Sequence, residues 1–123
     1  MRRIKQFLLL ASLGLVSCVS LESRARAPLV GDWRFTDKVQ SCHYSFKRDG
    51  TFTGEVTVKS KLVSKFNGRW SVEHDALLYM YLGDALGRIP AGATDRDRLL
   101  EVRPDWFRIE AADGSQRRYL RER

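Results

Sequence analysis

Histidine and cysteine are scarce in this sequence, and each occurs only twice among 123 residues. His43, His74 and the two cysteines have no recognisable zinc-binding spacing, so we expect no metal site. The chain is too short for two domains or for a large nucleotide-binding α/β enzyme. It is not short of hydrophobic side chains, which make up 43% of the residues and exclude a disordered chain.

The sequence motifs of common catalytic sites are also missing. It contains no Gly-x-Ser-x-Gly, no phosphate-binding loop and no dinucleotide fingerprint. Cys42 and His43 are adjacent, but neighbours on a strand point to opposite faces, so this thiol and imidazole cannot meet. His74 and Asp75 fall in a predicted turn exposed to solvent. We therefore expect a protein that is not an enzyme and that needs no cofactor.

No apolar run is long enough for a permanent membrane span, but a shorter run lies near the N-terminus. Arg2, Arg3 and Lys5 precede an apolar stretch over residues 7–16. As a helix, this stretch covers about half of a roughly 30 Å hydrocarbon core. A basic start followed by a short apolar run is typical of a secretory signal peptide, which we place at residues 1–17.

The segment 15–18, Leu-Val-Ser-Cys, resembles the lipobox of bacterial lipoproteins. The resemblance implies that residues 1–17 are removed and that Cys18 becomes a lipidated N-terminus. Several acyl chains, such as palmitate, give stable anchoring where a single chain is marginal. Val19 follows the cysteine, whereas an Asp there is the usual inner-membrane retention signal of Gram-negative bacteria. We therefore expect a protein exported to the outer membrane and facing the periplasm.

Cleavage also removes three of the positive charges that contribute to the formal net charge of +7. The remaining chain is mildly basic with acidic residues interspersed, so we expect no nucleic-acid partner. Residues 18–28 show no periodicity and end at a proline, which predicts a tether, followed by one domain over 29–123. With Cys18 lipidated, Cys42 has three interpretations: a small core residue, a reactive or intermolecular thiol, or, if Cys18 is not lipidated, its disulfide partner.

Within the domain, apolar residues recur with a period of two, which indicates strands with one buried and one exposed face. We expect strands near 30–36, 41–47, 51–62, 66–73, 77–82, 98–103, 106–111 and 116–121. Asp49-Gly50 and Asp113-Gly114 predict hairpin turns, and the glycine-rich residues 83–95 predict a longer loop. The fold class is therefore all-β, a small up-and-down antiparallel barrel of seven or eight strands whose closure removes exposed edges.

Several short motifs look like those of the small lipocalin-like domains of bacterial exported proteins. They are Gly31-x-Trp33, Asp49-Gly50-Thr51-Phe52, Gly68-x-Trp70 and the closing Asp113-Gly114 with Tyr119-Leu120-Arg121. The resemblance implies that Trp33 plugs one end of the barrel. It also implies that Arg118 or Arg121 covers the indole through a cation–π contact.

The alternation predicts a barrel interior filled by large side chains, so that a ligand would bind at the mouth or on the outside. The expected inward residues are Trp33, Cys42, Tyr44, Phe46, Phe52, Val56, Val58, Leu62, Phe66, Trp70, Val72, Leu78, Met80, Leu100, Val102, Phe107, Ile109 and Leu120. Asp95 and Asp97, with the two arginines beside them, are interpreted as solvated charges.

Tyr79 and Tyr81 would then lie opposite Leu78 and Met80, either under the 83–97 loop or as an exposed aromatic patch. We expect these tyrosines, Trp106 and this loop to flank a binding site for a small apolar ligand or a protein segment. The alternative is an envelope inhibitor that presents residues 19–28 to a secreted protease, or another protein-interaction module.

Overall fold

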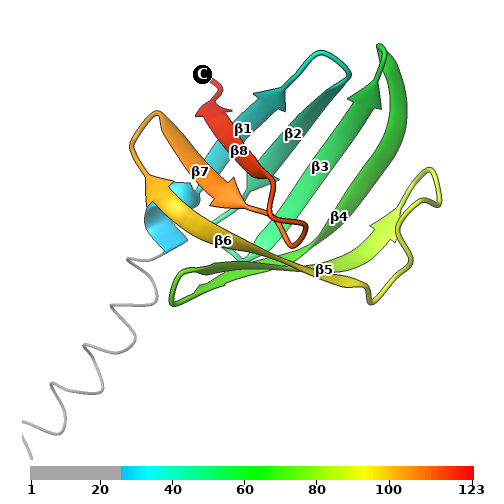
Figure 1. The fold of residues 1–123 in the computed structure, drawn as a ribbon. Helices are drawn as coiled ribbons and strands as arrows, with labels where there is room; N and C mark the ends of the chain where they lie inside the picture. Colours follow the sequence, from blue (N-terminus) through cyan, green and yellow to red (C-terminus); the bar gives the residue numbers. More distant parts are fainter. Residues whose placement is uncertain (1–25) are drawn as a thin grey trace, which may run out of the picture.

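The computed structural model describes residues 26–123. The signal peptide, Cys18 and most of the tether predicted above therefore lie outside the described residues. A short 3-10 helix, η1 (Ala27–Leu29), precedes eight strands (Figure 1). The strands are β1 (Gly31–Thr36), β2 (Gln40–Phe46), β3 (Thr51–Val58), β4 (Lys61–Glu73), β5 (Ala76–Asp84), β6 (Thr94–Val102), β7 (Trp106–Glu110) and β8 (Gln116–Arg121).

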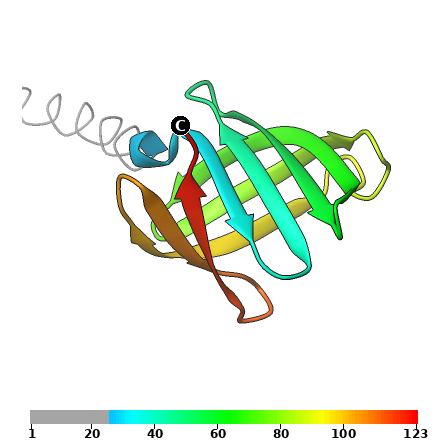
Figure 2. The same cartoon turned by 90° about the horizontal axis from the view of Figure 1, so that it is seen from above.

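Each strand pairs antiparallel with the next, and β8 returns to β1 to close a barrel (Figures 1 and 2). The prediction of an all-β, up-and-down barrel is therefore confirmed. The residues expected to form one strand over 51–62 instead form all of β3, a turn and the start of β4. Lys59 and Ser60 have φ angles of 50° and 67°, the positive values that a two-residue hairpin turn requires at both positions.

Aromatic rings fill the barrel interior, as the alternation predicts. All pairs among Tyr44, Phe46, Phe52 and Tyr79 have ring centroids 5.5 to 6.4 Å apart. Cys42 is buried within this core and has no disulfide partner among residues 26–123. The buried cluster consists of Leu29, Trp33, Cys42, Phe46, Phe52, Phe66, Trp70, Leu77, Tyr79, Tyr81, Phe107, Ile109 and Tyr119.

The predicted inward face is wrong on β5 and at the end of β8. Met80 is 38% exposed and Leu120 is 55% exposed, whereas their neighbours Tyr79, Tyr81 and Tyr119 are buried. Both faces of β5 are apolar in sequence, so alternation alone could not select the inner one. Register selects it: Tyr79 lies opposite the buried Trp70, and opposite residues of an antiparallel pair share a face. Leu78 therefore faces outward too, and Leu62 and Val102 are partly exposed.

Candidate functional site

Trp33 and Arg121 pack against each other beside η1. Trp33 is fully buried, and its Nε1 donates a hydrogen bond to the Leu29 carbonyl of η1 at 2.8 Å. The Arg121 guanidinium lies 4.1 Å from the centroid of the Trp33 ring. Its three nitrogens donate to the carbonyls of Pro104 at 2.7 Å and of Val30 and Pro28 at 2.9 Å each. These contacts hold residues 28–30 and the β6–β7 loop beside the Trp33 indole.

Arg118, the other arginine considered for this place, lies elsewhere. Its guanidinium is 4.1 Å from the ring centroid of Trp106, on the outer surface of β7 and β8. Trp106 faces outward because its neighbour Phe107 is 1% exposed and faces the core. The structure therefore separates Trp106 from Tyr79 and Tyr81, which lie inside the barrel with ring centroids 6.4 Å apart.

A small polar network accompanies the buried tyrosines. The Tyr79 hydroxyl donates to Asp97 Oδ2 at 2.9 Å, and Asp97 is 9% exposed, so the interpretation of Asp97 as a solvated charge is wrong. Burial raises the pKa of the Asp97 carboxyl, and the hydrogen bond from Tyr79 opposes part of that rise. Burial also raises the pKa of all four tyrosines that line the interior, which keeps their hydroxyls protonated: Tyr44, Tyr79, Tyr81 and Tyr119.

We expect Tyr79→Phe to lower the free energy of unfolding by about 1–2 kcal/mol, because it leaves the buried Asp97 carboxyl without its donor. Urea unfolding followed by circular dichroism measures this loss. The double variant Tyr79→Phe with Asp97→Leu should recover part of it, since no buried polar group is then left unpaired. A double variant no more stable than the single one would contradict this interpretation of the pair.

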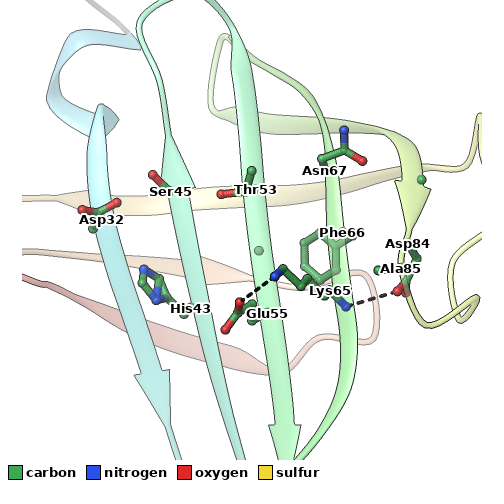
Figure 3. A pocket seen from close by; sticks show the side chains of 12 residues that line it. Asp32, His43, Ser45, Thr53, Glu55, Lys65, Phe66, Asn67, Asp84 and Ala85 are labelled. Atoms are coloured by element: carbon green, nitrogen blue, oxygen red, sulfur yellow. Dashed lines mark hydrogen bonds and ion pairs between the residues drawn. The ribbon is translucent and has the colours of Figure 1, made fainter.

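A hollow lies on the outside of the barrel, across β1 to β5 (Figure 3). It has a volume of about 810 Å³. Its floor is a row of short residues placed side by side by the strand register: Asp32, Ser45, Thr53, Asn67 and Gly83. These residues alternate with inward-facing neighbours, so their side chains face solvent. We call this row and its borders the outer trough.

Longer charged side chains border the outer trough on one side. His43, Glu55 and Lys65 form the next row across β2, β3 and β4. Lys65 Nζ lies 4.0 Å from Glu55 Oε1, and His43 Nε2 lies 3.2 Å from Glu122 Oε1. The Lys65–Glu55 pair is the dashed line between these two residues in Figure 3. The border therefore offers both signs of charge beside a floor of hydroxyl, carboxylate and amide groups.

Asp84 fixes the far end of the outer trough, where β5 leads into the β5–β6 loop. Its carboxylate accepts hydrogen bonds from the Ser64 hydroxyl and from the backbone N–H groups of Lys65, Leu86 and Ile89. Desolvation, the largest single influence, raises the pKa of Asp84, but these hydrogen bonds together lower it to about 2. The Asp84 carboxylate thus links β4 to the β5–β6 loop.

This contact predicts a pH dependence of stability. The unfolded chain binds a proton at Asp84 near its ordinary pKa of 3.8, whereas the folded chain binds it near 2. The contribution of Asp84 to the free energy of unfolding is therefore fully present above pH 3.8 and is lost as the pH falls towards 2. We expect the melting temperature of Asp84→Asn to fall less steeply with decreasing pH than that of the unaltered protein. An unchanged acid slope in the variant would contradict this role.

The outer trough was missed by sequence reasoning because its members are far apart in the chain. Thr53 and Asn67 are ordinary polar residues on the exposed face of two strands, and nothing local marks them. Only the register across five strands brings them into one row. The predicted 83–97 loop contributes its first residues to this hollow, while β6 begins at Thr94.

The barrel resembles a solved structure. A crystal structure of a lipocalin-like protein from Bacteroides uniformis matches it with a TM-score of 0.59 and 16% sequence identity. The match covers 77% of this chain and 99% of the other. The chain has a lipocalin-like fold. No protein-family model and no curated protein matches the sequence.

Two further features of the lipocalin-like barrel bear on its chemistry. Within residues 26–123, no group of three or more His, Cys, Asp or Glu side chains is arranged to hold a metal ion. The same part of the chain has no helix with the length and apolar character needed to cross a bilayer.

Proposed function

We propose that this protein is a lipid-anchored envelope protein whose lipocalin-like barrel is a non-enzymatic binding module for an extended segment of another protein. The binding site is the outer trough, and the anchor is acylated Cys18 at the outer membrane. The observation that carries the proposal is the hollow of about 810 Å³ on the outside of a barrel whose interior is filled.

The filled interior argues against a small apolar ligand in the usual cavity of a barrel. An eight-stranded barrel has room for either its own side chains or one small ligand. Here Phe52 and Trp33 are fully buried, and Tyr79 and Tyr81 are 4% and 6% exposed at the centre of the aromatic cluster. A ligand inside would have to displace several packed rings.

The chemistry of the outer trough suits an extended peptide. Side chains of Asp32, Ser45, Thr53 and Asn67 supply hydrogen-bond donors and acceptors that can pair with peptide N–H and C=O groups. Five strands spaced about 4.8 Å apart give a row about 19 Å long, which about six extended residues span. Charges of both signs along the border can select side chains of the bound segment.

Site-specific photo-crosslinking tests the proposed site. A photoreactive phenylalanine analogue at Thr53 should give a discrete protein adduct in cells of the source organism. The same analogue at Gln116, an exposed position of β8, should not give that adduct. Ser45→Arg should abolish the adduct from position 53 by filling the trough. Identical adducts from both positions, or none from position 53, would rule out the outer trough as the site.

The anchor is tested separately by the mass of the mature protein purified from membranes. We expect residues 1–17 to be absent and Cys18 to carry the mass of several acyl chains. A mature chain that keeps residues 1–17, or that begins at an unmodified Cys18, would exclude lipid anchoring.

A further inference from the structure

The outer surface of β6 to β8 and β1 carries arginines next to exposed apolar side chains. We define the Trp106 face as Arg34, Arg103, Trp106, Arg108, Arg118 and Leu120. Leu120 lies beside Trp106 on one strand and beside Arg34 on the other, and it is 55% exposed. The face lies outside the outer trough and takes no part in the peptide binding proposed above.

Arg118 is the arginine of this face that has no ion pair within residues 26–123, whereas Arg34 pairs with Glu122, and Arg103 and Arg108 pair with Glu101. Arg108 and Arg118 lie directly opposite each other on β7 and β8, an arrangement of like charges that is unfavourable by itself. No carboxylate among residues 26–123 lies within 4.0 Å of the Arg118 guanidinium. Arg108 has its Nε buried without a hydrogen-bond partner in the same part of the chain.

A hollow opens beside these arginines where the barrel closes. β1 and β8 pair in register only through Trp33 with Arg121 and Arg34 with Leu120. Beyond this short pairing lies a hollow of about 560 Å³, lined by Arg34, Arg118 and Leu120 and also by Arg121 and the Glu122 carboxylate. A negatively charged headgroup could enter between the two guanidinium groups while an acyl chain lies against Leu120.

We infer that the Trp106 face docks on an anionic lipid surface, with lipid phosphates between Arg34 and Arg118. Tryptophan, arginine and exposed leucine together are the side chains found where a protein meets the headgroup region. Basic residues next to an anionic leaflet gain attraction that neutral lipids do not supply. Glu101 pairs with Arg103 and Arg108, and Glu122 pairs with Arg34, and these ion pairs reduce the attraction to the lipid. Arg118 is therefore the main site of this attraction.

The position of the tether fits this orientation, and in this respect the inference rests on the proposed lipid anchor. Seven residues, 19–25, separate Cys18 from Arg26, and the eight Cα–Cα steps between them span at most about 29 Å when fully extended. The chain enters at η1, where Arg121 holds Pro28 together with Pro104, two residues before Trp106 (Figures 1 and 2). The face therefore lies beside the point at which the anchor reaches the barrel.

Quenching of tryptophan fluorescence by brominated lipids tests the docking. Trp33 and Trp70 are 0% and 4% exposed, so the half-buried Trp106 is the tryptophan that lipid can reach. The full lipidated chain is reconstituted in vesicles of acyl-brominated phosphatidylglycerol or phosphatidylcholine. We expect strong, salt-sensitive quenching only with phosphatidylglycerol, and loss of that quenching in Trp106→Phe.

Charge reversal supplies the matched comparison. Arg118→Glu should lower the ratio of docked to undocked protein on the order of thirtyfold, because it changes two unit charges next to the surface. Arg69→Glu makes the same change at an exposed position of β4, on the opposite side of the barrel, and should leave the quenching unchanged. Circular dichroism confirms that both variants remain folded.

Three results would overturn the inference. Equal quenching in both lipids would show that the anchor alone sets the position of the barrel. An equal loss in Arg118→Glu and Arg69→Glu would show that only net charge matters. Loss of quenching when phosphate replaces chloride at fixed ionic strength would assign the face to the free ion. Failure of the anchor is distinguishable, because the chain would then not sediment with phosphatidylcholine vesicles.

Discussion

Trp33→Ala should destabilise the barrel by about 3–5 kcal/mol, the range measured for removing a large buried aromatic side chain. Trp33 is 0% exposed, lies 4.7 Å from Phe107 ring to ring, and donates to the Leu29 carbonyl. Its loss also leaves the Arg121 guanidinium without the ring that it covers. Because small domains have only about 5–15 kcal/mol of stability, the variant should unfold at much lower urea concentration.

Trp106→Ala is the matched control for this experiment. Trp106 is half-buried on the outer surface and stacks under Arg118, so its removal should cost only about 1 kcal/mol. Urea unfolding of both variants, followed by circular dichroism, gives the comparison. Equal losses at the two positions would mean that the buried contacts of Trp33 do not stabilise the barrel in the way described.

Gly68→Ala should lower the free energy of unfolding by at least about 3 kcal/mol, the upper part of the range for overpacking a core. An added Cβ would lie 2.8 Å from Phe52 Cε1 and 3.0 Å from the Met80 carbonyl carbon, and closer still to the Met80 oxygen. The obstacle is backbone, which cannot move aside as a flexible side chain can. The bulge between Asn67 and Gly68 brings β5 this close.

Gly83→Ala provides the control for the second variant. It lies on the same pair of strands, but an added Cβ would meet only Asn67 Oδ1, at 3.6 Å. We expect a change within about 0.5 kcal/mol, as for an ordinary surface substitution. If Gly68→Ala were as stable as Gly83→Ala, the close approach of β5 to β4 would be wrong.

The pattern of alternating residues was sufficient to predict the barrel. Phe52 and Val56 on β3, and Phe66 and Trp70 on β4, alternate with polar neighbours, so the inner face of these two strands can be identified from the sequence. The glycines after Asp49 and Asp113 predicted two hairpins. Both glycines have a positive φ, 88° at Gly50 and 86° at Gly114. The alternation and the two turns depend on residues that are close together in the chain, so a single sequence is enough to predict them.

Features that depend on register could not be predicted. Tyr79 and Met80 are both apolar enough for the interior, and only the pairing of Tyr79 with the buried Trp70 selects the tyrosine. Asp97 of β6 is buried and accepts a hydrogen bond from the Tyr79 hydroxyl of the neighbouring strand, which no pattern of charges reveals. The outer trough likewise arises from five residues on five strands, so it exists only once the barrel has closed.

The central claim is that the barrel interior is filled and that binding takes place outside it. Titration with laurate, followed by nuclear magnetic resonance of the aromatic side chains, tests this most directly. We predict no saturable shift of the Tyr44, Tyr79 or Phe52 ring signals, since no space is left between these rings. Saturable one-to-one shifts of these inner rings would contradict the account and would place the ligand inside the barrel.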